Sequence, residues 1–426
     1  MTVPKTIELS EYKTLLLQRD ELDPVLGEML HLRYDGQVEV VPPSFKNDNQ
    51  WELTSQGWVG YIPLSSALGI SMTPKVPIRN LFRMLEYAYR LKSFEFLPDL
   101  FESDSLDDYY QRLANVLVKK ILLRNRQGLY KEYLGRDERL PLVRGRLNLT
   151  DVMRRPWEVR HECHFHEHSA DLDENRILAW TLNLILRTGV CSDNKTLANV
   201  RKAYRELIGK VGLQEYAPAE AIGRFYNRLN SDYQPMHALC RFFLEHAGPR
   251  HDLGDRTMLP FLVNMGRLFE LFVYEWMAQH LHEYLPTTYQ VDFQQKINVD
   301  SHGYVHFDVD LVILDSESGI TKCVLDTKYK VVDKPAAGDV GQVVSYAAGK
   351  RCSRAILVYP KSVDYVGGFV GDILVGTASF SLDGDLEEAG HAFLQELDLV
   401  APEVSDTSTI YPPPTGQQAS PVPVPS

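Results

Sequence analysis

The sequence predicts an α+β protein of several domains, with a β-rich N-terminal module, a helical middle region and a C-terminal core of mixed α/β structure. Three observations lead to this prediction. Short β-rich runs occupy the chain up to about residue 75. Apolar residues then recur at helical spacing, and beyond residue 289 their period returns to two. A length of 426 residues fits two or three domains of roughly 100–200 residues each.

The first 75 residues contain short runs rich in β-branched and aromatic residues. Turn-forming residues such as Pro42-Pro43-Ser44 separate these runs. We therefore assign residues 1–75 to a β-rich module whose strands include Thr6 to Leu9, Val38 to Val41 and Trp58 to Ile62.

Residues 76–255 are predicted to be mainly helical, because apolar residues follow the spacing of one helix face. We expect one short extended stretch in this region, near residues 140 to 149. The helical pattern is carried by Leu81, Met84, Leu85, Ala88 and Leu91, by Leu113, Val116, Leu117 and Ile121, and by the segments Asn175 to Leu186 and Leu197 to Ile208.

Residues 256–400 form the predicted C-terminal domain. A long apolar helix from Met258 to Leu281 opens it, and a second helix spans Asp339 to Ala348. The strands expected around that second helix are Tyr289 to Ile297, Tyr304 to Leu314, Cys323 to Val331 and Ala355 to Tyr359. Residues 401–426 are rich in proline and cannot build a core, so we predict a disordered tail there.

Composition limits the class of protein. The five cysteines are scattered without CxxC spacing, and no apolar run approaches the ~20 residues that span a bilayer. No signal-peptide pattern is recognisable, so we expect a cytoplasmic protein without a membrane partner. The net charge is −12, yet residues 119–160 carry twelve Lys and Arg residues against five acids, a local balance of +7. A solvated charged face and a surface that contacts phosphate or a partner both fit that segment.

Acidic residues and a lysine recur on two of the predicted strands. Asp308 and Asp310 share one face of their strand, and Asp326 and Lys328 share one face of the next. If the two strands are neighbours, Asp310, Asp326 and Lys328 converge at one edge of the sheet. Two carboxylates are ligands that Mg²⁺ prefers, and an adjacent ammonium can orient water and offset phosphate charge. A solvated face with a cross-strand ion pair is the alternative.

Two further features accompany this pair of strands. Glu270 lies in an apolar helix, where a carboxylate needs a polar partner or a cation. Arg267 shares its helical face, so a simple Arg267–Glu270 surface pair is the alternative. Gln342 and Tyr346 lie one turn apart on the helix that follows the Asp-x-Lys strand.

The order Glu, Asp, Asp-x-Lys, Gln-x-x-x-Tyr resembles the PD-(D/E)xK nuclease fold, in the variant with a Gln-x-x-x-Tyr helix found in RecB-like nucleases. Val309 stands where that family usually has Pro. Asp310 is preferred as the ligand because it precedes an aliphatic run at 311–314, and Asp308 is the alternative. The resemblance implies that the C-terminal domain is a PD-(D/E)xK nuclease core.

A closer resemblance spans residues 74–346. The segment Asp326-Thr327-Lys328-Tyr329-Lys330 is similar to the signature of McrC, the nuclease subunit of McrBC-type restriction systems. Other segments that match this family in order are Pro74-Lys75-Val76, Asn80-Leu81, Met84-Leu85, Arg144-Gly145-Arg146, Cys163, Asp171, Asn175-Arg176-Ile177-Leu178 and Leu268-Phe269-Glu270.

This resemblance implies an endonuclease that cuts double-stranded DNA, with modified cytosine as the expected target, in complex with a hexameric McrB-like AAA+ GTPase ring. The sequence contains no GxxxxGK[ST], so a separate motor would hydrolyse nucleotide. Residues 1–255 would dock on or insert into that ring. The candidates for stimulating its hydrolysis are Arg79, Arg83, Arg144 and Arg146.

The site residues follow from the same resemblance. Asp310 and Asp326 would hold Mg²⁺, with Glu270 as an additional or water-mediated ligand, and Lys328 would assist the attacking water. Gln342 and Tyr346 would position the site or the DNA backbone, and Lys330 would contact phosphate.

Three rival interpretations stay open. A zinc site could form on the run His161, Cys163, His164, His166 and His168, although adjacent residues of one strand make a poor chelate. The chain could instead be a non-catalytic adaptor that activates a AAA+ motor. It could also be a RecB-like repair nuclease, which would more often be fused to a helicase.

Overall fold

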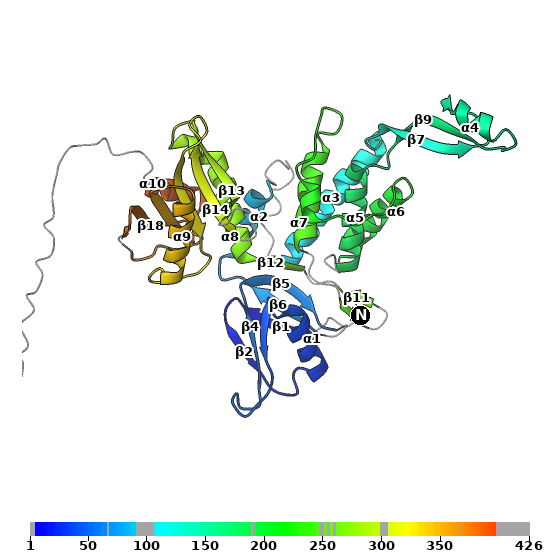
Figure 1. The fold of residues 1–426 in the computed structure, drawn as a ribbon. Coiled ribbons are helices and arrows are strands. Elements are labelled where there is room, and N and C mark those ends of the chain that lie inside the picture. The colour runs from blue at the N-terminus through cyan, green and yellow to red at the C-terminus, as the bar shows by residue number, and fades with distance from the viewer. Residues whose placement is uncertain are drawn as a thin grey trace, which may run out of the picture.

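The computed structural model describes residues 5–65, 68–90, 106–188, 191, 193–246, 251–253, 256–258, 261–298, 306–365 and 367–397. The predicted proline-rich tail at 401–426 lies outside these residues. Figure 1 shows the N-terminal module in blue at the bottom of the view. The helical region and a projecting arm lie on the right, and the C-terminal sheet, in yellow and orange, lies on the left. The structure is of mixed α+β class, with several separate sheets.

The N-terminal module contains two small sheets around one core. Strands expected from the sequence are present as β1, β3 and β5, while α1 follows an Asp23 N-cap that accepts a hydrogen bond from Val25 N. The sheet orders are β1-β6-β5-β12 and β2-β4-β3. The elements are β1 (Lys5–Ser10), β2 (Thr14–Leu17), α1 (Pro24–Tyr34), β3 (Val38–Val41), β4 (Trp51–Ser55), β5 (Trp58–Pro63) and β6 (Leu68–Thr73).

Strand β12 (Phe261–Asn264) crosses the predicted domain boundary. It lies in the segment assigned to the C-terminal domain, yet it pairs antiparallel with β5 and completes the N-terminal sheet. Gly60 makes this possible, since its φ is +135° and a Cβ there would overlap Phe261 O. The helix expected from Met258 begins instead at Met265, because Asn264 Oδ1 accepts from Arg267 N and caps it.

The middle region packs its long helices together. These are α3 (Leu106–Gln127), α5 (Asp173–Thr188), α6 (Asn194–Ile208) and α7 (Tyr233–His246), with the short helix η3 (Pro218–Ala221) and the strand pair β10 (His251–Leu253) and β11 (Arg256–Met258). Helix α2 (Ile78–Ala88) contacts these helices, with Phe82 stacked on Tyr109 of α3 at 4.0 Å, and it also contacts the C-terminal domain. Its Asn80 side chain donates to Leu382 O at 2.7 Å and Gly384 O at 2.9 Å, which fastens α2 to the C-terminal domain.

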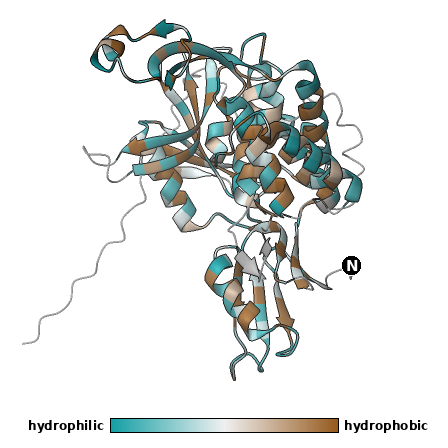
Figure 2. Cartoon of the chain, turned by 90° about the vertical axis from the view of Figure 1, so that its right-hand side faces the viewer, coloured by the Kyte–Doolittle hydropathy of each residue, from teal (hydrophilic) through white to brown (hydrophobic). Residues whose placement is uncertain are grey.

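A three-stranded arm projects from the helical region (Figure 1). It contains β7 (Glu132–Leu140), β8 (Arg146–Leu147), α4 (Leu149–Arg154) and β9 (His161–Ser169), in sheet order β7-β9-β8. The short extended stretch expected near 140–149 is present as β8, but the two longer strands β7 and β9 were not predicted. Most residues on both faces of these strands are polar, as their mostly hydrophilic colours in Figure 2 show, so no apolar period of two marks them.

The C-terminal domain is a six-stranded mixed sheet with helices on both faces. The strand order is β13-β14-β15-β16-β18-β17, antiparallel from β13 to β15 and parallel from β15 to β18. The strands are β13 (Tyr289–Asn298), β14 (His306–Asp315), β15 (Thr321–Thr327), β16 (Arg354–Tyr359), β17 (Gly368–Val370) and β18 (Ile373–Ser379). The helices are α8 (Met265–His280), η4 (Leu281–Glu283), α9 (Ala337–Gly349) and α10 (Leu386–Glu396).

Alternating residues of the central strands pack into two different hydrophobic cores, one on each face of the sheet. Leu311 and Leu325 join the core shared with α8, whereas Val312 and Val324 join the core under α9. Because both faces are covered, these strands are continuous apolar runs. Strand β15 ends at Thr327, four residues earlier than expected. None of the helices in the described ranges is long and apolar enough to cross a membrane.

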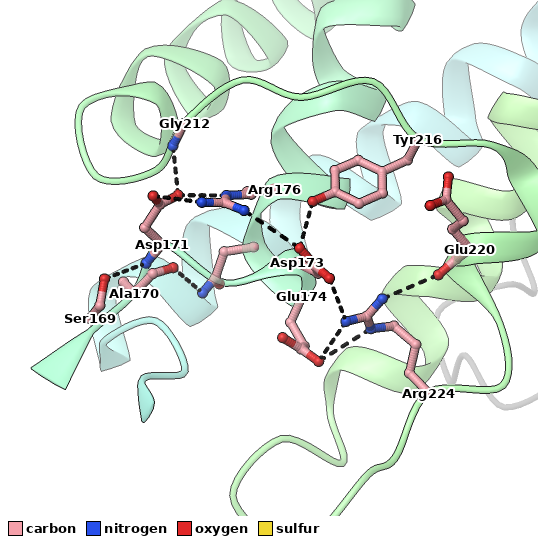
Figure 3. Close-up of polar contacts among 11 residues, drawn as sticks. Ser169, Ala170, Asp171, Asp173, Glu174, Arg176, Gly212, Tyr216, Glu220 and Arg224 are labelled. Carbon is pink, nitrogen blue, oxygen red and sulfur yellow. Dashed lines mark hydrogen bonds and ion pairs between the residues drawn. The ribbon is translucent and has the colours of Figure 1, made fainter. Parts of the chain in front are cut away.

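The base of the arm is joined to the helical region by a polar network at the start of α5 (Figure 3). Asp171 accepts from Arg176 through two hydrogen bonds, Nε at 2.7 Å and Nη2 at 2.8 Å, and from Gly212 N at 2.8 Å. Asn175 is buried and donates to Tyr130 O and Ala170 O. Residues that carried the family resemblance at 171–178 therefore fix the joint between β9 and α5.

We expect Asp171→Asn to lower the free energy of unfolding by about 1–2 kcal/mol at pH 7. The Arg176 guanidinium holds the pKa of Asp171 at about 2, below its ordinary value of 3.8. Since the folded-state pKa is lowered, this stabilisation is present above about pH 4 and is lost as the pH falls toward 2. Denaturant unfolding of the variant and the parent between pH 2.5 and 7 measures it.

The matched control is Asp20→Asn, since Asp20 is exposed in a turn. An Asp171→Asn effect as small as that of the control, or one that does not shrink in acid, would contradict the role of the Asp171–Arg176 pair.

Candidate functional site

The predicted acidic residues meet between two neighbouring strands. β14 and β15 pair antiparallel with Leu311 opposite Leu325, so Asp310 and Asp326 lie one position beyond this pair on the two strands. Thr327 holds the first carboxylate, because its backbone N and its Oγ1 both donate to Asp310 Oδ2, at 2.8 and 3.0 Å. The expectation that the two strands are neighbours is confirmed.

A chain of polar contacts runs from β15 to α9. The Asp326 side chain is only 1% exposed, and its Oδ2 lies 2.6 Å from Lys328 Nζ. The same Nζ donates to Gln342 Oε1 at 3.0 Å, and Gln342 Nε2 donates to Tyr346 OH at 2.6 Å. Because each side chain holds the next, the lysine ammonium has a defined position between a buried carboxylate and a helix amide.

Glu270 approaches the site from α8. Its Oε2 lies 3.1 Å from Arg267 Nη1, so the simple ion pair considered from the sequence does form. The carboxylate is nevertheless only 25% exposed, and the charges of Asp310 and Lys328 both act on it. Glu270 therefore belongs to the same electrostatic environment as the strand residues.

Burial disfavours the charged form of all three carboxyl groups. It raises the pKa of Asp326 to about 7, an effect that Asp310 adds to and Lys328 opposes. Burial also raises the pKa of Asp310, against the hydrogen bonds from Thr327, and the pKa of Glu270, where Asp310 contributes. A divalent cation at these oxygens would stabilise the ionised forms, so the donor set fits a hard ion such as Mg²⁺.

Two of the predicted residues have other contacts. Lys330 forms an ion pair with Asp339 in the first turn of α9. Asp308, the alternative ligand, is 60% exposed, with its Oδ2 3.8 Å from His306 Nε2. The structure thus places Asp310, rather than Asp308, beside the Asp326–Lys328 segment.

Asp310, Asp326 and Glu270 do not bring one ligand atom each within 4.8 Å of one another. Within the described ranges, the one group of three His, Cys, Asp or Glu ligand atoms all within 4.8 Å of one another is His280, Glu283 and His391. The histidine run on β9 forms no such group. His164 pairs there with Asp137, and the ring of His168 stacks on Tyr133 at 4.7 Å.

Sequence reasoning missed a contact from the N-terminal module. Tyr329 OH, between the two lysines of the site, donates to Glu11 Oε2 at 3.2 Å, and Lys75 N donates to the same oxygen at 3.2 Å. Glu11 is fully buried, which raises its pKa. Nothing in the local sequence links residues 11 and 329, because their contact depends on how the module packs. Thr327 was also missed, although it lies inside the recognised motif.

Comparisons with known proteins identify related chains. A family model described as the McrBC 5-methylcytosine restriction system component matches residues 35–360. The chain is 25% identical over 220 residues to the Type IV methyl-directed restriction enzyme EcoKMcrBC of Escherichia coli strain K12. That alignment covers 49% of this chain and 60% of the relative, so the chain spans less than two thirds of the curated protein it matches.

One solved structure shows a similar fold, and a second gives a weaker match. A chain of the refined half-complex from a tetradecameric assembly of Thermococcus gammatolerans McrB AAA+ hexamers with bound McrC matches with a TM-score of 0.54 and 16% identity. The match covers 93% of this chain and 100% of that one. The cryo-EM structure of the Thermococcus gammatolerans McrBC complex matches with a TM-score of 0.41 and 17% identity, over 65% of this chain and 88% of that one.

We expect Tyr329→Phe to lower the free energy of unfolding by about 1–3 kcal/mol, because the buried Glu11 carboxylate loses a hydrogen-bond donor. Thermal and urea unfolding at pH 7 measure the change. Tyr133→Phe is the control, since Tyr133 is 71% exposed on the arm. Equal stability of the two variants would rule out an energetic role for the Tyr329–Glu11 contact.

Proposed function

The chain belongs to the McrBC 5-methylcytosine restriction system component family, and from this premise we propose that it is the DNA-cleaving subunit of a McrBC-like restriction system. The observation that carries the proposal is the meeting of Asp310, Asp326 and Lys328 on two neighbouring inner strands of a mixed sheet, with Glu270 beside them. Carboxylates and an ammonium in this arrangement suit Mg²⁺-dependent hydrolysis of a phosphodiester. The C-terminal sheet would then be a PD-(D/E)xK nuclease core.

Asp310 and Asp326 would hold Mg²⁺, and Glu270 would act as a further or water-mediated ligand. When bound, the ion would polarise the scissile phosphate and lower the pKa of a water molecule. Thr327 keeps the Asp310 carboxylate oriented through two donors. Because Asp326 is buried, its charged form depends on the cation and on Lys328.

Lys328 is the residue that would act on the attacking water and on the phosphate charge. Its side chain is 18% exposed and can therefore reach a substrate, while Asp326 and Gln342 fix its position. Gln342 and Tyr346 would hold this lysine and the adjacent DNA backbone. Lys330, paired with Asp339, would contribute to the phosphate-facing surface only from the edge of the site.

The partner we propose is a hexameric McrB-like AAA+ GTPase ring, and the substrate is double-stranded DNA containing modified cytosine. The E. coli relative is named as a methyl-directed restriction enzyme, and the Thermococcus assembly contains McrB hexamers with bound McrC. The projecting arm is the surface that best suits a partner. Its exposed apolar residues are Tyr133, Leu142, Val143, Leu149, Met153, Trp157 and Val159, all more than 60% exposed.

Two of the four candidate arginines lie on the arm. Arg144 is 52% exposed, lies over the Phe165 ring at 4.1 Å, and lines an open concave surface together with Arg146. Arg144 Nη1 also lies 3.8 Å from Glu167 Oε1, whereas Arg83 is only 25% exposed and forms a closer ion pair with Asp385 at 2.9 Å. Arg144 and Arg146 are therefore the residues we propose for stimulating nucleotide hydrolysis by the ring.

Cleavage assays with the AAA+ partner test the nuclease assignment. Asp326→Ala, Lys328→Ala and Asp310→Ala should each lower Mg²⁺-dependent cleavage of modified DNA at least about 100-fold, while the partner's nucleotide hydrolysis stays intact. Lys322→Ala, on the same strand as Asp326, is the control and should cut normally. Asp308→Ala tests whether Asp308 or Asp310 is the metal ligand on β14. This variant should keep most of the activity.

Retained cleavage in both Asp326→Ala and Lys328→Ala would refute the site. Hydrolysis of nucleotide without cleavage, even by the unmutated chain, would favour a non-catalytic adaptor. Cleavage from DNA ends without any partner would favour a RecB-like repair nuclease.

Nucleotide hydrolysis assays test the arm. We expect Arg144→Ala with Arg146→Ala to lower the stimulated hydrolysis rate of the partner at least about 10-fold, since an arginine can stabilise charge during phosphoryl transfer. Arg201→Ala is the control, because Arg201 is exposed on α6 and is not among the candidate arginines. Equal losses from the arm variant and the control would contradict the assignment.

A further inference from the structure

A second cluster of ligand-type side chains lies where the end of α8 meets the middle of α10. His280 is the last residue of α8, Glu283 ends η4, and His391 lies in the middle of α10. His280 Nδ1 lies 2.9 Å from Glu283 Oε1, and His391 Nδ1 lies 3.8 Å from Glu283 Oε2. One ligand atom from each residue lies within 4.8 Å of the others.

These separations suit the coordination of one ion. Two ligands of a tetrahedral ion with bonds of ~2.0–2.1 Å lie roughly 3.3 Å apart. His280 and Glu283 reach this range because side chains three residues apart come into line on a tight helical turn. His391 is brought to them by α10, so the cluster depends on tertiary packing.

Buried aromatic rings hold both imidazoles in place. Trp276, fully buried, stacks on the His280 ring at 4.4 Å and meets the His391 ring edge-on at 5.6 Å. Gly390 permits the approach of α10, since a Cβ there would overlap the Trp276 ring. The two histidine ligands are therefore positioned by contacts with the core, and Glu283 approaches them from the surface.

Further polar groups surround the cluster. Glu387 Oε2 lies 3.9 Å from His280 Nε2 and accepts from Trp276 Nε1 at 3.3 Å. A carboxylate behind the second nitrogen of a metal-binding histidine is the usual way in which such a ring is oriented. Tyr284 OH lies 2.9 Å from His391 Nδ1. If this nitrogen binds the ion, the hydrogen bond to Tyr284 must break, and the hydroxyl would then lie beside the ion.

We propose that His280, Glu283 and His391 bind one zinc-class divalent ion, with water at a remaining position. Two imidazole nitrogens and one carboxylate oxygen favour Zn²⁺ and its neighbours over Mg²⁺, which prefers oxygen ligands throughout. With neutral imidazoles as ligands, the two carboxylates of Glu283 and Glu387 balance the charge of the ion. The side chains of His280, His391 and Glu283 are 21%, 37% and 50% exposed, so an ion can enter from solvent.

The bound ion would link α8 to α10 at the end of α8 opposite to Glu270. His280 lies ten positions after Glu270, about 15 Å along the helix axis. The zinc-class site is thus distinct from the proposed magnesium site, and the proposal does not depend on nuclease activity.

Metal titration of the purified full chain tests the inference. We expect isothermal titration with Zn²⁺ to give one site of micromolar or tighter affinity, and Co²⁺ to give a visible absorption band that Zn²⁺ abolishes. His391→Ala and His280→Ala should each weaken Zn²⁺ binding at least about 100-fold, and Glu387→Gln should weaken it about 10–100-fold, as substitutions behind metal-binding histidines do. Zn²⁺ should raise the midpoint of thermal unfolding of the parent but not of His391→Ala.

Two matched variants control for other histidines. His282→Ala removes an exposed histidine of the same turn, and His166→Ala removes one from β9, so both should bind Zn²⁺ as the parent does. Unchanged Zn²⁺ binding in a folded His280→Ala/His391→Ala double variant would overturn the proposal, as would the absence of stoichiometric binding by the parent. Far-UV circular dichroism verifies folding, and Glu387→Gln keeps the test valid if the histidine variants unfold. A protein that does not bind Zn²⁺ could still show Mg²⁺-dependent cleavage, so the two proposals can be refuted independently.

Discussion

The candidate nuclease site depends on one buried ion pair, between Asp326 and Lys328. A carboxylate that is 1% exposed cannot stay ionised without a compensating charge, and the ammonium at 2.6 Å supplies part of it. Asp310 acts in the opposite direction, since its negative charge further raises the pKa of Asp326. The two strands therefore hold more negative charge than one lysine balances, which is the electrostatic condition for binding a cation.

Contacts from distant parts of the chain support this region. Tyr329 follows the site lysine directly and reaches Glu11 in the N-terminal module. Strand β12 joins that module's sheet and leads directly into α8, which carries Glu270. A force on the N-terminal module, such as docking of a partner, would consequently act on two elements that hold site residues. The N-terminal module and the C-terminal domain are therefore linked by β12 and α8 and are not independent structural units.

Elements with a strong apolar pattern were predictable, and those without one were not. The strands around Asp310 and Asp326 follow from runs such as Leu311 to Leu314, which only a doubly covered sheet can bury. The arm strands β7 and β9 were not predicted, because cross-strand polar pairs such as Arg136–Glu167 hold them, and their one apolar face buries only Cys163 and Phe165. The start of α8 was misplaced, since an apolar run continues from β12 into the helix and only the Asn264 cap divides the two.

The sequence by itself determined the chemistry of the candidate site: the kinds of side chain, their spacing along two strands and one helix, and their order in the chain. Local spacing fixes these features, because residues two apart on a strand and four apart on a helix must share a face. Only the tertiary structure decided which distant groups meet them. Glu11 reaches Tyr329, and His391 reaches His280 and Glu283, through packing between elements far apart in the chain, and no local pattern encodes such contacts.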